Sequence, residues 1–322
     1  MADDVLTWLL DGDPALRWQV ERDLLDAPPE VWQATRARVA TEGFGARLLA
    51  HQDPDGQWAG GAYFPRPDGD PTWPEGEGQP WTATTWSLTA LREWGCDPTA
   101  LGDTAERLAA GCRWEYDDLP YWGGEVDVCI NATTLANGVW LGVDVEDLAH
   151  WFPEHQLADG GWNCAWVEGS TVSSVHSTLN AVRGLLAHEI ATGGDDALRA
   201  ARHRGEEHLL ARHLLHRSDG ELLDACTTPP VAPSRWRYDV LRVLEHLRLA
   251  GLHDGTAPDP RAAEAVDRLR AGRGADGRWR QGPVERGAVW FDVDVPEGEP
   301  SRWLTLGGER VLRWWDAGQQ HP

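Results

Sequence analysis

The sequence predicts an all-α protein, a single α/α toroid of about six inner/outer helix pairs that spans residues 1–322. Three observations lead to this fold class. A tight turn recurs along the chain, helical segments of two kinds alternate between the turns, and no alternating apolar/polar pattern of comparable strength indicates strands. An inner ring of buried helices wrapped by an outer ring of amphipathic helices accounts for all three.

The recurring turn has the pattern Asp-Gly-x-Trp. Two copies carry a Gln three residues before the Asp, and the third carries an Arg there, giving Gln-x-x-Asp-Gly-x-Trp as the fuller motif. The Asp caps the turn, the Gly adopts a positive φ, and the Trp can staple the turn onto a neighbouring helix. The complete copies begin at Asp55, Asp159 and Asp276, and degenerate copies stand at 121–124 and 218–222.

Between the turns, helical segments that are apolar or small on almost every face alternate with charged, amphipathic ones. The first kind is typical of buried inner helices and the second of outer helices that begin at a cap or a Pro. The chain opens with a further helix over 15–25. The expected inner helices cover 81–94, 129–141, 175–187, 238–249 and 303–315. The expected outer helices cover 30–50, 99–112, 145–155, 196–213 and 260–270.

Two segments rich in Pro, Gly and acidic residues, 63–80 and 282–300, are expected to be loops. Each of them leads into an inner helix. Because the inner helices of such a ring run parallel, we expect both loops to lie on one rim of the toroid.

Composition excludes several classes of partner. With 52 acidic residues against 29 basic ones, the formal net charge is −23. That charge disfavours nucleic acid and anionic membrane surfaces. No apolar run is long enough for a membrane span, and the N-terminus does not resemble a signal peptide. Five cysteines without paired spacing argue against a disulfide framework. We therefore expect a soluble, cytoplasmic protein.

The repeated motif and the inner/outer alternation resemble the repeats that squalene–hopene cyclases share with protein prenyltransferase β-subunits. The resemblance covers essentially the whole chain and implies a toroid whose central cavity binds isoprenoids or lipid-like chains. It implies an enzyme (a cyclase, lyase or transferase) that takes a hydrophobic small-molecule substrate, in specialised metabolism. The chain shows no sequence feature that would bind a partner subunit.

The resemblance also implies catalytic residues. The cyclases carry Asp-x-Asp-Asp, whose central Asp protonates an alkene, and the nearest match here is Asp292-Val293-Asp294-Val295. This match lacks the final Asp, so a standard squalene cyclase is not expected, and a solvated acidic loop is the plainer interpretation. The cyclases also pair two toroids, whereas 322 residues form only one.

The prenyltransferase β-subunits hold zinc through Asp-x-Cys at the start of one inner helix and a His at the start of the next. Asp127-Val128-Cys129 and His176 match these positions. A carboxylate, a thiolate and an imidazole leave one position open, as catalytic zinc requires. Cys164 is an alternative to Cys129. The plainer interpretation is a cap, a buried inert thiol and a local hydrogen bond.

One departure from the prenyltransferases concerns the diphosphate. Their basic residues before Asp-x-Cys are missing here, since 121–126 contains no basic residue. Diphosphate binding at that position is therefore in doubt.

Asp239, one turn into the fifth expected inner helix, is a further candidate for a general acid or base or a fourth metal ligand. An ion pair with Arg237 or Arg242 explains it equally well. Aromatic residues on or near the inner helices would suit an apolar chain or stabilise a carbocation, or else pack between helix layers. These substrate-binding candidates are Trp81, Trp86, Trp140, Trp236, Tyr238 and Trp303.

Three hypotheses follow. The first is zinc-assisted chemistry at Asp127, Cys129 and His176 on an isoprenoid or lipid-like substrate. The second is a metal-free, acid-catalysed cyclase or isomerase that uses Asp239 or Asp294. The third is a non-catalytic toroid that binds a ligand or a protein. A saccharide-processing toroid is a more remote alternative, because Trp and carboxylates also suit sugars.

Overall fold

The computed structural model describes residues 3–66 and 77–319. Within these residues the chain forms thirteen α-helices, six short 3-10 helices and isolated β-bridges, and no β-strand. The all-α prediction is confirmed. No helix in this part of the chain combines the length and the apolar character that crossing a membrane would need.

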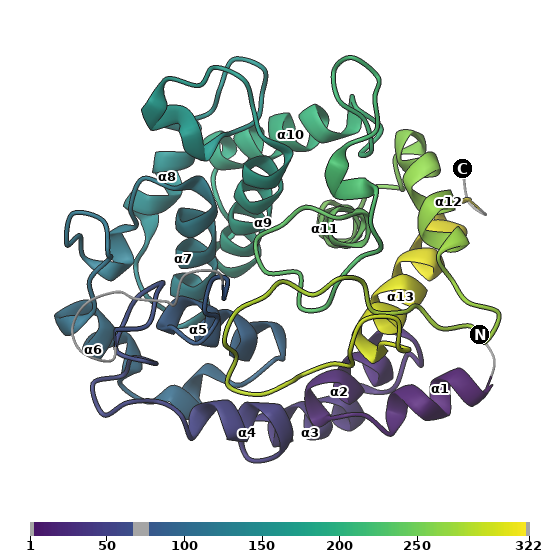
Figure 1. Cartoon of the computed structure of the whole chain (residues 1–322), viewed down its shortest axis with the longest axis horizontal. Helices are drawn as coiled ribbons and strands as arrows, with labels where there is room; N and C mark the ends of the chain where they lie inside the picture. The colour runs from purple at the N-terminus through teal and green to yellow at the C-terminus, as the bar shows by residue number, and fades with distance from the viewer. Residues whose placement is uncertain (1–2, 67–76, 320–322) are drawn as a thin grey trace.

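The helices form two concentric rings (Figure 1). The inner helices are α2 (Pro14–Asp23), α5 (Thr84–Glu93), α7 (Val128–Trp140), α9 (Val175–Thr192), α11 (Val240–Asp254) and α13 (Arg302–Gln319). The outer helices are α1 (Asp3–Leu10), α3 (Pro29–Ala37), α4 (Gly43–Leu49), α6 (Thr104–Gly111), α8 (Glu146–Glu154), α10 (Asp196–Leu210) and α12 (Ala263–Ala271). With α3 and α4 sharing one outer position, this is the predicted α/α toroid.

Contacts between inner helices close the ring. α5, α7, α9, α11 and α13 pack in sequence order, and α13 packs against α2. The remaining step is bridged by Trp18 on α2, whose indole N–H donates to the carbonyl of Trp94 at the end of α5 at 2.8 Å. Burial separates the two layers as expected. Most residues of α9 and α11 are buried, whereas α12 buries a single stripe.

The Asp-Gly-x-Trp turns tie the two layers together. Gly56, Gly160 and Gly277 have φ values of +89°, +91° and +77°, so only glycine fits them without strain. The indole N–H of each motif Trp donates to the carbonyl ten residues earlier, in the last turn of an outer helix. The pairs are Trp58 with Leu48, Trp162 with Phe152 and Trp279 with Leu269, at 2.8–2.9 Å.

The same tryptophans also contact the next inner segment. Each backbone N–H donates to a buried threonine hydroxyl at 3.0–3.1 Å, and the acceptors are Thr84, Thr178 and Thr305. The predicted role of the motif as a scaffold that ties helix layers together is confirmed.

The loop 282–300 crosses the ring and reaches the start of α5. The backbone N–H of Trp81 donates to the carbonyl of Ala288 at 2.8 Å, and the indole N–H of Trp290 donates to the carbonyl of Thr82 at 3.0 Å. The two predicted loops therefore meet on one rim. This holds for the described residues, since 67–76 of the first loop lie outside them.

One placement from the sequence is wrong. Asp239 does not lie inside a helix: α11 begins at Val240, and Asp239 is its N-cap, with extended backbone. Its carboxylate accepts the backbone N–H of Arg242 at 2.8 Å. The first backbone N–H groups of a helix have no partner within the helix, which explains why an Asp stands beside an otherwise apolar segment.

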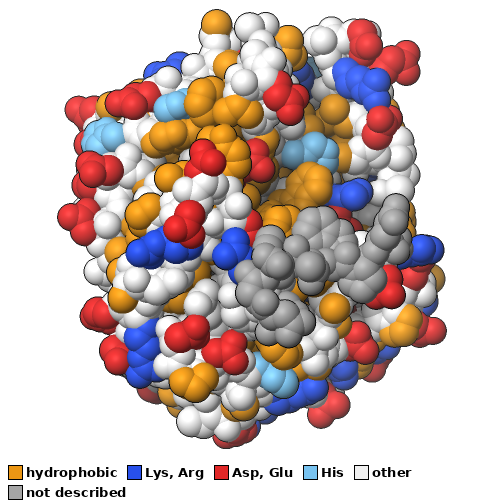
Figure 2. All heavy atoms as spheres, turned by 60° about the vertical axis from the view of Figure 1, so that its left-hand side comes forward, with side chains coloured by type: hydrophobic (Ala, Val, Ile, Leu, Met, Phe, Trp, Pro, Cys, Tyr) orange, Lys and Arg blue, Asp and Glu red, His pale blue; other side chains and the backbone are white. Residues whose placement is uncertain are grey.

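Acidic side chains are spread over the face seen in Figure 2, interspersed with arginines and hydrophobic side chains. This distribution follows from the excess of acidic residues in the chain. The charged side chains inside the ring of helices are arranged differently from those on this acidic outer surface.

Candidate active site in the central cavity

A cavity of about 690 Å³ lies inside the ring. Its wall is built by α5, α7, α9 and α11, together with residues 232–235 and 281–297 of the rim loops. This volume is typical of sites for small molecules. Neither α13 nor α2 contributes to the described wall.

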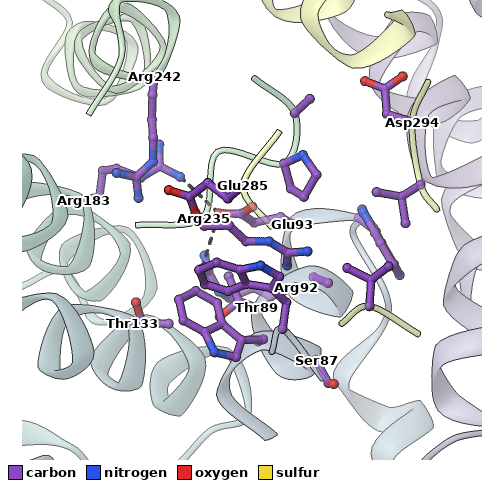
Figure 3. A pocket seen from close by; sticks show the side chains of 18 of the residues that line it. Ser87, Thr89, Arg92, Glu93, Thr133, Arg183, Arg235, Arg242, Glu285 and Asp294 are labelled. Carbon is purple, nitrogen blue, oxygen red and sulfur yellow. Dashed lines mark hydrogen bonds and ion pairs between the residues drawn. The ribbon is translucent and has the colours of Figure 1, made fainter. Parts of the chain in front are cut away.

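Four arginines line this cavity: Arg92 on α5, Arg183 on α9, Arg235 in the loop before α11, and Arg242 on α11. Figure 3 shows Arg183 and Arg242 side by side, with Glu93 and Arg235 close to them. The Nη2 atoms of Arg183 and Arg92 lie 3.1 Å and 3.7 Å from Oε1 of Glu93. One carboxylate therefore forms ion pairs with an arginine of α5 and an arginine of α9.

The other two arginines have no such partner. Arg242 donates to the side-chain carbonyl of Asn180 at 2.7 Å and to the backbone carbonyl of Arg237 at 3.1 Å. The Arg235 guanidinium lies 5.0 Å from the centre of the Trp81 ring. Among the described residues, neither guanidinium forms an ion pair with a carboxylate. Burial lowers the pKa of Arg242 to about 9 and that of Arg235 to about 10.

Glu93 faces the cavity rather than the outer surface. Its side chain is 46% exposed although it lies within the ring, so the exposure is to the cavity. Burial within the ring opposes its ionisation, but Arg183 and Arg92 outweigh that effect and hold its pKa below the usual value. The carboxylate is therefore ionised and accessible to a bound molecule.

Asp294 lies apart from the arginines, on the loop 282–300 (Figure 3). Its carboxyl accepts a hydrogen bond from the Ser301 hydroxyl, and Nε2 of Gln281 donates to it at 3.4 Å. Burial raises the pKa of Asp294 from 3.8 to about 6, against these hydrogen bonds. It holds a proton to a higher pH than an ordinary Asp, which is the property a general acid needs.

The predicted aromatic residues divide into two groups. Trp81 and Trp86 line the cavity. The other four do not belong to the described wall: they are Trp140, Trp236, Tyr238 and Trp303. The phenol of Tyr238, for example, is buried and donates to the carbonyl of Leu214 at 2.6 Å, which is a core contact. The aliphatic part of the wall comes from Leu186, Ile190, Leu249, Val284 and Val289.

The predicted zinc ligands lie near one rim, and none of them lines the cavity. Asp127 is the N-cap of α7, and the backbone N–H of Tyr238 donates to Nδ1 of His176 at 2.9 Å. The Cys129 sulfur accepts from Nδ2 of Asn180 at 3.4 Å and from the Cys164 thiol at 3.5 Å. The thiols therefore pair with each other, and the three predicted ligands do not form a compact set.

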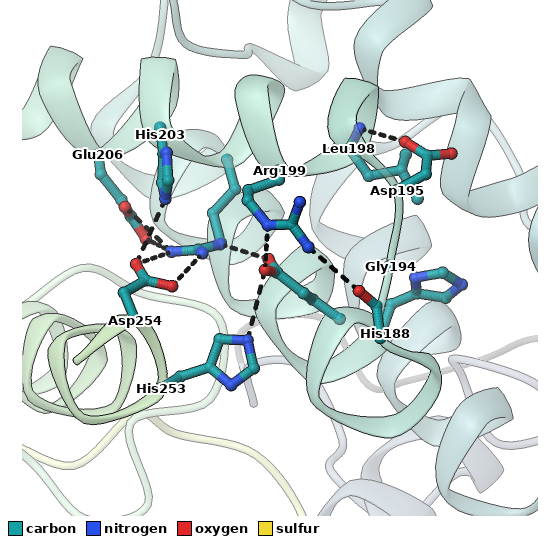
Figure 4. Close-up of polar contacts among 12 residues, drawn as sticks. His188, Gly194, Asp195, Leu198, Arg199, His203, Glu206, His253 and Asp254 are labelled. Atoms are coloured by element: carbon teal, nitrogen blue, oxygen red, sulfur yellow. Dashed lines mark hydrogen bonds and ion pairs between the residues drawn. The ribbon is translucent and has the colours of Figure 1, made fainter.

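Compact groups of potential ligands within the described residues are Glu189–His253–Asp254 and His203–Glu206–Asp254. Figure 4 shows Glu206, His203 and Asp254 turned toward one another. The fully buried guanidinium of Arg202 bonds to Glu189, Glu206 and Asp254 at 2.8–2.9 Å. A cation thus already occupies this cluster, and we derive no reaction step through a metal.

Sequence reasoning did not identify the four arginines or Glu93 as cavity residues, and it named Arg242 only as an ion-pair partner of Asp239. A signal was present on α9, where Asn180, Arg183 and Ala187 stand at helical spacing within a segment that is otherwise apolar. A charged residue on an inner helix must face either a partner or a cavity. Arg235 had no such signal, because it lies in a loop.

No protein-family model and no curated protein matches the chain. Among solved structures, the chain is similar to a GH76 α-mannanase from Bacteroides thetaiotaomicron, with 15% identity and a TM-score of 0.40 over 74% of this chain and 68% of the mannanase. A likeness of this size does not assign the chain to a family.

Proposed function

We propose that this protein is an enzyme that binds an amphipathic, anionic small molecule in the central cavity and converts it with Asp294 as general acid. One observation carries the proposal: two arginines that have no carboxylate partner among the described residues and one protonatable carboxyl line the same cavity, which also has an apolar wall. Asp239 is set aside as the acid because its carboxylate caps α11.

The arginines support an anionic group on the substrate. Removing a cation from water costs several kcal/mol unless a counter-charge or hydrogen bonds compensate for it. Arg242 has carbonyl oxygens as acceptors, but no carboxylate within ion-pair distance among the described residues. A phosphate, diphosphate or carboxylate on the substrate would supply the missing charge through strong charge-assisted hydrogen bonds.

The rest of the wall supports an apolar chain. Ile190, Val284 and Val289 are 41–55% exposed although they line the cavity, so their apolar surface is open to a ligand. An isoprenoid or lipid-like chain would cover it and would gain roughly 25 cal/mol per Å² of apolar surface removed from water. The faces of Trp81 and Trp86 could then stabilise a carbocation that forms on the chain.

The reaction class that fits is metal-free, acid-catalysed cyclisation or isomerisation. Asp294 would protonate an alkene of the substrate while the arginines hold the anionic group at a distance. Because the pKa of Asp294 is about 6, turnover should fall as pH rises above that value, when the acid loses its proton.

The test uses linear isoprenyl diphosphates of ten, fifteen and twenty carbons as probes, with product analysis by mass spectrometry. Arg242→Gln should raise the dissociation constant for the probes at least tenfold. Asp294→Asn should bind normally but lose turnover by a factor of at least one hundred. Asp219→Asn, in the degenerate turn at 218–222, is the control. Turnover by Asp294→Asn at the wild-type rate would contradict the proposed acid.

A further inference from the structure

His246 lies on the cavity face of α11. Arg242 is four residues before it and Leu249 three residues after it, and all three line the cavity. Its side chain is only 1% exposed, so the imidazole is held within the cavity wall and does not project into the cavity. The acid-catalysed mechanism above assigns no role to it.

A carboxylate from the outer layer fixes the orientation of this imidazole. Nε2 of His246 lies 2.9 Å from Oε1 of Glu206 on α10. Burial would raise the pKa of Glu206, but His246 and Arg202 outweigh burial and hold it below its usual value. The carboxylate is therefore an acceptor, and Nε2 must carry the imidazole proton.

The other ring nitrogen then has a free lone pair. Nδ1 is buried and has no hydrogen-bond partner among the described residues. The two nitrogens of an imidazole point in roughly opposite directions. Since Nε2 faces Glu206 on α10, Nδ1 lies on the side of the imidazole that is turned away from α10. A buried acceptor without a partner costs about 1–3 kcal/mol, so its presence suggests a task.

Three charged groups affect the pKa of the His246 imidazole. Glu206 and Arg202 face it from α10, and Arg183 acts on it from α9. Burial is the largest effect and lowers the pKa of His246, with help from both arginines, against the effect of Glu206. The imidazole is therefore neutral near pH 7, which is the form that can accept a proton.

We propose that His246 is the general base of this cavity, oriented by Glu206, and that it completes the reaction that Asp294 begins. This inference rests on the proposed function. The O–H bond of Asp294 breaks as its proton adds to a substrate alkene, which leaves a carbocation. Nδ1 of His246 then takes a proton from a carbon next to that cation, and the electron pair of the broken C–H bond forms a new double bond. One proton enters and one leaves, so product and substrate are isomers.

The first experiment needs no turnover. Long-range ¹H–¹⁵N correlation spectra of labelled protein, assigned with His246→Gln, should show His246 with a proton on Nε2 and none on Nδ1. Added inorganic diphosphate should shift the Nδ1 resonance and raise the pKa of the imidazole, because an anion near Arg242 favours the imidazolium. A proton on Nδ1, or no response to diphosphate, would overturn the inference, since a purely structural histidine sealed from the cavity would not respond.

The second experiment uses whichever isoprenyl diphosphate is turned over. His246→Gln should lower kcat about 10²–10⁴-fold with little change in KM, and imidazole should partly restore His246→Ala. The acid limb of the pH–rate profile, where the base is protonated, should disappear in His246→Gln. Glu206→Gln should shift the acid limb. Asp254→Asn is the control, because it disturbs the same Arg202 cluster without touching His246, and it should leave the acid limb in place.

These outcomes separate the two proposals. Wild-type turnover by His246→Gln, with Asp294→Asn inactive, would remove the base and leave the proposed function standing. Failure of every probe substrate would count against the proposed function, and the spectroscopic experiment would then decide the role of His246 alone.

Discussion

Asp239 and Asp294 show how one residue type acquires two different roles. Both stand close to apolar segments in the sequence. The Asp239 carboxylate accepts a hydrogen bond from a backbone N–H in the first turn of α11. Its role is therefore structural. The Asp294 carboxyl accepts hydrogen bonds from the Ser301 hydroxyl and from Gln281 and lines the cavity, where burial favours its protonated form. Local hydrogen bonds, rather than residue type, decide between cap and acid.

Asp294 should leave a signature in the pH dependence of stability. Its folded-state pKa, about 6, lies above the ordinary 3.8, so the folded state binds the proton more tightly than the unfolded state does. Its contribution to stability is therefore present below pH 4 and lost as pH rises through 6. Two pKa units correspond to about 3 kcal/mol, an upper limit because the cavity admits water.

Asp294→Asn removes this titration. The free energy of unfolding of the variant, relative to wild type, should rise between pH 4 and pH 7 when both are followed by urea denaturation. Asp292→Asn, at an exposed carboxylate two residues away, is the control. A difference between Asp294→Asn and wild type that stays constant over this pH range would show that Asp294 is an ordinary solvated carboxyl.

The zinc site stays a prediction of the sequence. Elemental analysis of the purified protein tests it directly, since a site at Asp127, Cys129 and His176 should hold about one zinc per chain. Cys129→Ser and His176→Ala should each lose the metal. Cys164→Ser asks whether the neighbouring thiol, 3.5 Å from Cys129, takes part. Protein without stoichiometric metal would remove zinc from the mechanism.

At the scale of elements, the turn motif was predictable because all of its requirements are local. Gly160 needs a positive φ, and Trp162 reaches a carbonyl ten residues away. The loop 282–300 was predictable as a loop but not as a cavity wall. Its course depends on contacts far along the chain, such as Trp290 stacked on His51 with 4.3 Å between ring centres. No local pattern encodes a contact of that range.

The threonine that accepts a hydrogen bond from the turn offers a test of the scaffold. Thr178 is fully buried, and its hydroxyl accepts the backbone N–H of Trp162 at 3.0 Å. Thr178→Val keeps the shape but leaves that N–H without a partner, which should lower the free energy of unfolding by about 1–3 kcal/mol. Urea denaturation measures the loss.

Thr134→Val is the matched control. Thr134 is equally buried, but its hydroxyl donates to the carbonyl of Ile130 within its own helix, at 2.9 Å. In the variant, that carbonyl still accepts a backbone hydrogen bond within the helix. The loss in free energy of unfolding should therefore be smaller than for Thr178→Val. Equal losses at the two positions would mean that the turn-to-helix bond does not hold the layers together.

At the scale of the whole molecule, long-range ion pairs join helices that are far apart in the sequence. Arg310 on α13 contacts Asp23 on α2 and Glu245 on α11, so one side chain connects three inner helices across the point where the ring closes. The sequence predicted the ring from its repeats, but not which charges cross it. Such pairs depend on the final distance between helices that are far apart in sequence.

Arg202 has the same role between α9, α10 and α11. Its side chain is fully buried and bonds to Glu189, Glu206 and Asp254, one from each helix. Arg202→Met would leave three carboxylates without their shared cation and should cost about 3–5 kcal/mol at pH 7 in urea denaturation. Arg261→Met, which removes a more exposed pair with Glu207, should cost under about 1 kcal/mol.

The pH dependence of this loss should be opposite to that of Asp294. Arg202 helps to hold the pKa of each of the three carboxylates below its ordinary value, against burial. Their contribution to stability is therefore present above the unfolded pKa near 4 and lost as pH falls through the lower folded values. The difference between wild type and Arg202→Met should shrink as pH falls toward 4, because the carboxylates left in the variant take up protons. A difference that is independent of pH would mean that Arg202 stabilises the ring by packing alone.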